Sequence, residues 1–259
     1  MKSYLNNPEL KKRFVEEIKK HKEADSIIQG TYGEVNEEWK GCAVSCSLRS
    51  LDIIEGKELK TEYKNHKDYE TKLGIPEWLA RLEDTLFERM EAKDAKKFPL
   101  KFAEAIPVGV DLKPVKYKFG AYLMQENINT VLSLDIEQDL KNTVISAITE
   151  VLKLHQKAIK TGIWDSPAAD LAAHSAYLVA DSAHSISHSV YLVAHSAHSI
   201  AHSIAYLVAH SAAYSAADSG HSAVHLVLCL AINSAAHLVE HSAETKKYSD
   251  KLINLLKKS

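Results

Sequence analysis

The first part of the chain contains the residue types of a nucleophilic catalytic site. Cys42 follows Gly41 at the start of an apolar segment. If a helix begins at Cys42, its N-terminus would lower the pKa of the thiol and favour the thiolate. His66 could then act as the base, with Glu83 or Asp84 orienting the imidazole. The sequence therefore offers Cys42, His66 and Glu83 as a candidate catalytic set, and a Cys42-dependent hydrolase or transferase as one possible function.

Other roles for the cysteines stay open. An apolar-flanked cysteine such as Cys42 is more often buried and unreactive than catalytic. Cys42 and Cys46 form a single C-x₃-C pair, which lacks the second pair of a typical zinc site. The chain has 3 cysteines, and an odd number argues against a disulfide framework. We therefore expect a cytoplasmic protein.

A second candidate site lies in a low-complexity run of Ala, Ser, His and Tyr over residues 166–241. Within residues 175–203, serines and leucines recur at alternating steps of three and four, a seven-residue period typical of a helix. On a helical wheel, one face carries Ala, Val and Ile, and the opposite face carries Tyr, His and Asp. We call the polar face the Tyr/His stripe. Its candidate ligand-binding residues are Tyr177, His184, His188, Tyr191, His195, His198, His202, Tyr206, His210 and Tyr214.

The repeat favours a binding role over a catalytic one. Its Ala and Ser framework is constant while His, Tyr and Asp alternate at equivalent positions. This pattern is typical either of a tolerant exposed face or of a binding surface whose contact residues vary. One continuous helix over 166–241 would be roughly 110 Å long. The run must therefore fold back or pair with another chain, and the Ala-rich seam predicts a homo-oligomer.

Histidine pairs in the repeat raise the question of metal binding. Two imidazoles one helical turn apart can share Zn²⁺. However, the period of the repeat forces spacings of three and four, so the pairs are not independent indications. Residues 237–241 match H-x-x-E-H, but little acidic sequence follows that could supply a third ligand. Zinc is therefore disfavoured, and we predict no metal or other cofactor. The four i,i+4 pairs are His184/His188, His198/His202, His221/His225 and His237/His241.

The composition of the chain is that of a globular protein and gives no sign of a membrane or nucleic-acid partner. The chain has 259 residues, of which 46% are hydrophobic and 25% charged, which is ordinary for a globular protein with a core. The net charge is -2, which gives no electrostatic case for nucleic acid or an anionic membrane as partner. The longest apolar stretches are too short to span a bilayer, and the charged N-terminus does not resemble a secretory signal. We expect a soluble protein.

The pattern of helix signals predicts a mainly α-helical fold. Asn7 and Pro8 indicate a helix start, and apolar residues then recur to about Ala24. Further helices are expected after Pro76, after Pro114 and up to Gly162. The segment over residues 39–48 fits either a buried strand or a helix. We predict a mainly helical domain over 1–162, with or without a small β element, a helical repeat over 163–243 and an amphipathic helix over 244–259 that packs back on the first domain.

Three segments resemble an uncharacterised family of phage and bacterial proteins. They are KGCAVSC at residues 40–46, GIPEWLARLED at 74–84 and AIPVGVDL at 105–112. Members of that family have a similar KGCAVGC segment, a similar GIPEWLARLED helix and an Ala/Ser-rich repetitive C-terminal region. The resemblance covers most of residues 10–165, and the repeat in style only. Here Ser45 stands where relatives often have glycine.

The resemblance implies no catalytic assignment, but it favours a phage accessory role. Such a protein could counter host defence by binding a host protein or by sequestering a small nucleotide-like ligand. Tyr and His side chains can stack on a base and donate hydrogen bonds to phosphates. The leading prediction is therefore a binding protein that uses the Tyr/His stripe.

Overall fold

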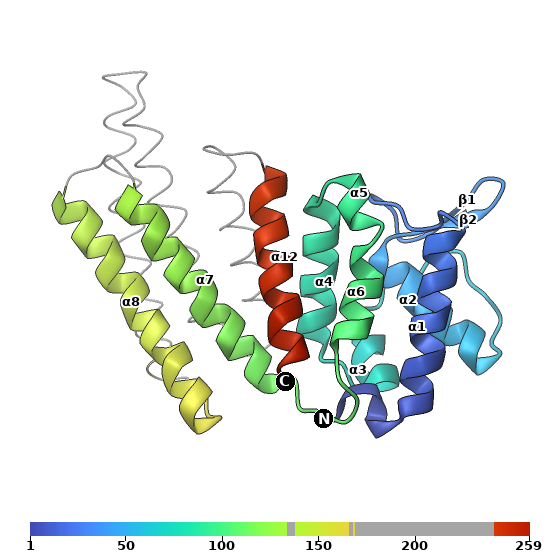
Figure 1. Cartoon of the computed structure of the whole chain (residues 1–259), viewed down its shortest axis with the longest axis horizontal. Helices are drawn as coiled ribbons and strands as arrows, with labels where there is room; N and C mark the ends of the chain where they lie inside the picture. The colour runs from blue at the N-terminus through green and yellow to red at the C-terminus, as the bar shows by residue number, and fades with distance from the viewer. Residues whose placement is uncertain (134–137, 166–167, 169–240) are drawn as a thin grey trace, which may run out of the picture. The chain divides into compact units, whose positions relative to one another are not determined.

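The structure is a computed structural model that describes residues 1–133, 138–165, 168 and 241–259 (Figure 1). The described residues are mainly α-helical and contain one two-stranded sheet, which confirms the predicted fold class. The chain divides into two compact units. The first comprises Met1–Val115 and Ser242–Ser259, and the second comprises Lys116–His241.

Helices form most of the first unit, which holds the catalytic candidates. Tyr4, Phe14, Phe87 and Phe102 are among the largest side chains in its core. Its elements are η1 (Ser3–Asn6), α1 (Pro8–Glu23), β1 (Glu34–Val35), β2 (Trp39–Lys40), α2 (Ala43–Glu55), α3 (Lys67–Leu73), α4 (Glu77–Arg89), α5 (Ala92–Ala95), α6 (Phe98–Ala105) and α12 (His241–Lys257).

Helix α1 begins where the sequence predicts. The side chain of Asn7 accepts hydrogen bonds from the backbone N–H groups of Glu9, at 3.0 Å, and Leu10, at 3.1 Å. These bonds satisfy two of the N–H groups that a helix start leaves without partners. Phe14 and Ile18, one turn apart, are buried against the rest of the unit.

The ambiguous segment at residues 39–48 contains both a strand and a helix. Residues 39–40 form β2, which pairs antiparallel with β1 so that Glu34 lies opposite Lys40. After Gly41 the chain turns, and Cys42 is the N-cap of α2. The helical alternative at Cys42 is therefore confirmed, because the strand ends two residues earlier.

Helix α4 lies in the middle of the first unit and packs against α2, α3 and α6. Pro76 is its N-cap, as expected from the Gly-Ile-Pro signal. Leu79, Leu82 and Leu86 are fully buried, at the helical spacing of three and four. This packing fixes the orientation of α4, and with it the positions of the buried polar residues Glu83 and Asp84.

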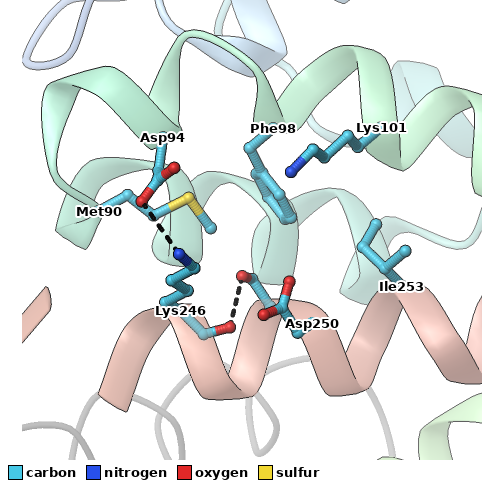
Figure 2. Close-up of a pocket in the computed structure, with 8 residues that line it drawn as sticks. Met90, Asp94, Phe98, Lys101, Lys246, Asp250 and Ile253 are labelled. Atoms are coloured by element: carbon cyan, nitrogen blue, oxygen red, sulfur yellow. Dashed lines mark hydrogen bonds and ion pairs between the residues drawn. The ribbon is translucent and has the colours of Figure 1, made fainter. Parts of the chain in front are cut away.

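Helix α12 belongs to the first unit, as the sequence predicts for the C-terminal helix. Leu252 and Leu256 are buried. Figure 2 shows α12 beside the chain around α5 and α6, where Lys246 Nζ lies 4.0 Å from a carboxylate oxygen of Asp94. A cavity of about 20 Å³ between Met90, Phe98 and neighbouring residues has room for one water molecule.

The second unit contains helix α8 (Gln138–Thr161) and most of helix α7 (Lys113–Ser133). Gly162, with φ of 71°, ends α8 in the left-handed conformation that favours glycine. The boundary between the units falls inside α7, after Val115. None of the described helices is both long enough and apolar enough to span a membrane.

Candidate functional site around Cys42

Cys42 lies at the first turn of α2. Its backbone N–H donates to the carbonyl oxygen of Thr31 at 2.9 Å, and its own carbonyl accepts from the N–H of Cys46 at 2.9 Å. The Sγ atom lies 3.3 Å from the hydroxyl of Ser45. Cys42 is only 1% exposed. The thiol is therefore held in a fixed position under the surface.

His66 and Asp84 form a pair beside this turn. His66 is the N-cap of α3, and its Nε2 atom lies 2.9 Å from Oδ2 of Asp84 on α4. The hydroxyl of Tyr32 donates to the same Oδ2 atom at 2.9 Å. Oδ1 of Asp84 is buried and has no hydrogen-bond partner among the described residues. One oxygen of this carboxylate is thus held by two side chains, and the other accepts no hydrogen bond.

Asp84 also lies close to both Cys42 and Glu88. The Sγ atom of Cys42 and one carboxylate oxygen from each of Asp84 and Glu88 all lie within 4.8 Å of one another. Asp84 and Glu88 are four residues apart on α4, so their side chains share one face of the helix. Glu88 is exposed, and its Oε2 accepts a hydrogen bond from the backbone N–H of Gly30 at 2.8 Å.

The orienting residue for His66 is Asp84, not Glu83. Glu83 accepts a hydrogen bond from the hydroxyl of Tyr69 at 2.9 Å and is 1% exposed. Burial raises the pKa of Glu83 to about 8. Adjacent residues on a helix point about 100° apart, so Glu83 and Asp84 cannot face the same partner. Of the two carboxylates that the sequence offered for this role, the structure places only Asp84 against the imidazole.

The sequence-based expectation of a lowered thiol pKa is wrong. Burial first, and the nearby Asp84 carboxylate second, raise the pKa of Cys42 to about 12, while the hydrogen bonds with Ser45 lower it. Both of the larger effects disfavour the thiolate. They outweigh the attraction of the α2 N-terminus, which is worth about 1 kcal/mol at a typical helix end. The thiol is therefore neutral in this conformation.

A short stretch, residues 29–33, lies beside the site, and we call it the cover segment. The side-chain amide of Gln29 donates to the carbonyl oxygens of Phe87, at 2.7 Å, and Met90, at 2.9 Å. The bonds described above attach Gly30 to Glu88, Thr31 to Cys42 and Tyr32 to Asp84. The cover segment is thus fixed to both α4 and the start of α2.

Sequence reasoning missed two members of this site, Tyr32 and Glu88. The position of Glu88, one helical turn after Asp84 in a strongly amphipathic segment, was a usable signal. Tyr32 offered only the glycines on either side of it, which indicate a loop but not its contacts. The ten residues of the Tyr/His stripe predicted to bind a ligand lie outside the described residues.

Comparison of the chain with protein-family models, with curated proteins and with solved structures found no match.

Proposed function

We propose that the protein is a cysteine-dependent hydrolase or acyltransferase with Cys42 as its nucleophile. The observation that carries this proposal is the His66–Asp84 pair, 2.9 Å long, next to a cysteine that begins a helix. A nucleophile, a base and a group that orients the base are the minimum set for covalent acyl transfer. In this assignment Cys42 and His66 are the catalytic residues, and Asp84 is a positioning residue.

In this proposal each imidazole nitrogen has one role. Nε2 of His66 lies against Asp84, which supports Nδ1 as the nitrogen that accepts the thiol proton. The sulfur then attacks an acyl carbon, and the leaving group departs with the proton from His66. Water or a second nucleophile takes the acyl group from the sulfur and restores the thiol. Backbone N–H groups in the first turn of α2 lack intrahelical partners and can stabilise the oxyanion.

Burial of Cys42 adds a requirement for movement. At 1% exposure, the sulfur cannot meet a substrate in the conformation described here. The cover segment is the element whose Tyr32 bonds to Asp84, so its displacement would open the site and free that carboxylate for His66 alone. We therefore infer that substrate binding displaces Tyr32, which is itself 40% exposed.

Binding through the Tyr/His stripe remains a prediction that rests on the sequence. The same holds for the resemblance to phage and bacterial proteins, for an accessory role against host defence and for self-association through the Ala-rich seam. These proposals concern a different part of the chain from Cys42. They are compatible with a catalytic first unit.

An ester probe tests the proposal without knowledge of the natural substrate. The full-length protein is incubated with 4-nitrophenyl acetate, and the acetylated residue is identified by peptide mass mapping. We expect one acetyl group on Cys42, none in Cys42→Ser, and an unchanged adduct in Cys46→Ala. Cys46 is a matched control because it lies one turn further along α2 and is also buried, but among the described residues it is not part of the cluster with Asp84 and Glu88. Acetylation of Cys46 and Cys42 at equal rates would refute the proposal.

A further inference from the structure

The three side chains that meet at the end of the cover segment have the chemistry of metal ligands. The ligand atoms of Cys42, Asp84 and Glu88 lie within 4.8 Å of one another. A thiolate and two carboxylates bound to Zn²⁺ at bond lengths of about 2.0–2.3 Å lie about 3.5 Å apart. The described separations therefore exceed those of bound zinc ligands by at most about 1.3 Å. Small movements of the three side chains would bring their ligand atoms to bonding distance of one ion.

The second, independent observation is the unused oxygen of Asp84. The residue is 8% exposed, and Oδ1 is buried without a hydrogen-bond partner in the described part of the chain. Both donors, Tyr32 and His66, bind Oδ2. A buried carboxylate oxygen without a partner destabilises the folded chain, because it has lost its hydrogen bonds to water. A cation at Oδ1 would remove that destabilisation.

The surroundings of the carboxylates are those of oriented metal ligands. Ligating side chains in metal sites are held by outer hydrogen bonds, and removal of such bonds weakens metal affinity by about 10- to 100-fold. Here Asp84 is held by His66 and Tyr32, and Glu88 is held by the backbone N–H of Gly30. These hydrogen bonds leave Oδ1 of Asp84 without a partner in the described part of the chain.

The geometry points to a divalent-cation site, suited to Zn²⁺, formed by the sulfur of Cys42 and the carboxylates of Asp84 and Glu88. A sulfur ligand favours zinc over Mg²⁺ or Ca²⁺, which prefer oxygen ligands only. Three protein ligands leave a fourth position for water. The thiol proton is released to solvent when the sulfur binds the metal. This inference goes beyond the proposed function, because it assigns a metal to the cluster and adds Glu88, while it shares Cys42 and Asp84 with that function.

Zinc binding has a consequence for the proposed reaction. A sulfur bound to Zn²⁺ is a weaker nucleophile than a free thiolate, so on the proposed function the zinc form is a resting form. The same ligands hold Cys42 away from oxidants until the metal leaves. Zinc is therefore expected to inhibit acetylation of Cys42, and a chelator is expected to restore it.

Cobalt provides the test, because a thiolate bound to Co²⁺ gives a near-ultraviolet charge-transfer band that histidine ligands do not give. This choice matters because the repeat contains many histidines. The full-length protein is freed of metal with a chelator and titrated with Co²⁺. We expect a sulfur-to-cobalt band that saturates at one metal per chain, disappears on addition of Zn²⁺ and is absent in Cys42→Ser but present in Cys46→Ala.

Two carboxylate variants make the test specific for this cluster. Glu88→Gln should weaken Co²⁺ binding at least about tenfold. Glu62→Gln removes another exposed carboxylate, one that pairs with Lys64 in the described part of the chain, and it should leave the affinity unchanged. Both residues are exposed, so these variants keep the test valid even if Cys42→Ser does not fold. Absence of the band in the wild type, or equal affinities for the two variants, would overturn the inference.

The cobalt titration and the acetylation assay fail independently. Acetylation is measured in the presence of a chelator, so it reports on Cys42 without metal. A cobalt band without acetylation supports the metal site and refutes the proposed function. Acetylation of Cys42 without a cobalt band supports the proposed function and refutes the metal site.

Discussion

The Nε2 atom of His66 lies 2.9 Å from Oδ2 of Asp84, although 17 residues lie between the two in the sequence. The pair is made by tertiary structure: His66 begins α3, Asp84 lies within α4, and these helices pack against each other. Cys42 on α2 meets the same carboxylate. The proposed catalytic set thus depends on the starts of α2 and α3, which both lie near Asp84 on α4.

Asp84 and its neighbour Glu83 provide a matched pair of variants. Asp84→Asn removes the charge that orients and stabilises the imidazolium, so acetylation of Cys42 should slow by about 100-fold or more. Glu83→Gln keeps a hydrogen-bond acceptor for Tyr69 and does not contact His66, so the rate should change by less than about threefold. The measurement is the rate of nitrophenolate release under a single turnover. Similar rates in the two variants would remove Asp84 from its positioning role.

Gly33 holds the cover segment in place. Its φ is 133°, and a Cβ atom there would lie 1.9 Å from the carbonyl oxygen of Thr61. Gly33→Ala must therefore displace the cover segment, and we expect alkylation of Cys42 by iodoacetamide to accelerate at least about tenfold. This rise corresponds to about 1.4 kcal/mol in the opening equilibrium.

Gly56→Ala is the control for the backbone strain alone. Gly56 has a φ of 66°, but nothing lies within 4 Å of a Cβ atom there. This variant should lose about 1 kcal/mol of stability and leave the alkylation rate of Cys42 unchanged. Equal alkylation rates in Gly33→Ala and Gly56→Ala would show that the cover segment does not limit access to the thiol.

His21 makes the first unit sensitive to acid. It is 8% exposed, and its Nε2 atom is buried without a hydrogen-bond partner among the described residues. Burial, followed by repulsion from Arg49, lowers the pKa of His21 to about 4. Because this folded-state pKa is below the usual 6.5, the unfolded chain binds more protons between pH 6.5 and pH 4.

Stability should therefore fall as the pH falls through this window, by up to about 3 kcal/mol from His21. Urea unfolding at pH 7 and pH 5 measures how the unfolding free energy changes with pH in the wild type and in His21→Leu. The variant should retain less of the acid sensitivity, because its side chain cannot bind a proton. A slope that is identical in both proteins would contradict this assignment.

Apolar burial, and not the ion pair, attaches α12 to the first unit. Leu252 is fully buried, so Leu252→Ala should cost about 2–5 kcal/mol of unfolding free energy. Lys246 is largely exposed and lies 4.0 Å from Asp94, so Lys246→Ala should cost less than about 1 kcal/mol. Urea unfolding of both variants measures the two losses of unfolding free energy. A larger loss in Lys246→Ala than in Leu252→Ala would show that the ion pair contributes more than apolar burial.

Local signals predicted the helices well because helix ends are set by nearby residues. Asn7 with Pro8 begins α1, and Gly162 ends α8, as expected from capping chemistry. The segment around Gly41 was ambiguous because it holds a strand and a helix in succession. A single apolar run does not reveal such a change.

The site was only partly predictable. Residue type alone selected Cys42, His66 and Glu83, with Asp84 only as an alternative to Glu83. The start of a helix at Cys42 was correctly offered as one alternative. The sequence failed on the thiol pKa, because burial and the approach of Asp84 are consequences of packing. It also missed Tyr32, whose contact with Asp84 spans 52 positions and leaves no periodic pattern.

Whether His66 is the base for Cys42 is tested most directly by comparing acetylation of Cys42 in the wild type and in His66→Gln. Both full-length proteins are treated with 4-nitrophenyl acetate in the presence of a chelator, with helix content checked by circular dichroism. If the imidazole takes the thiol proton, the rate at Cys42 should fall by about 100-fold or more in the variant. An unchanged rate in a folded His66→Gln protein would contradict the proposed function.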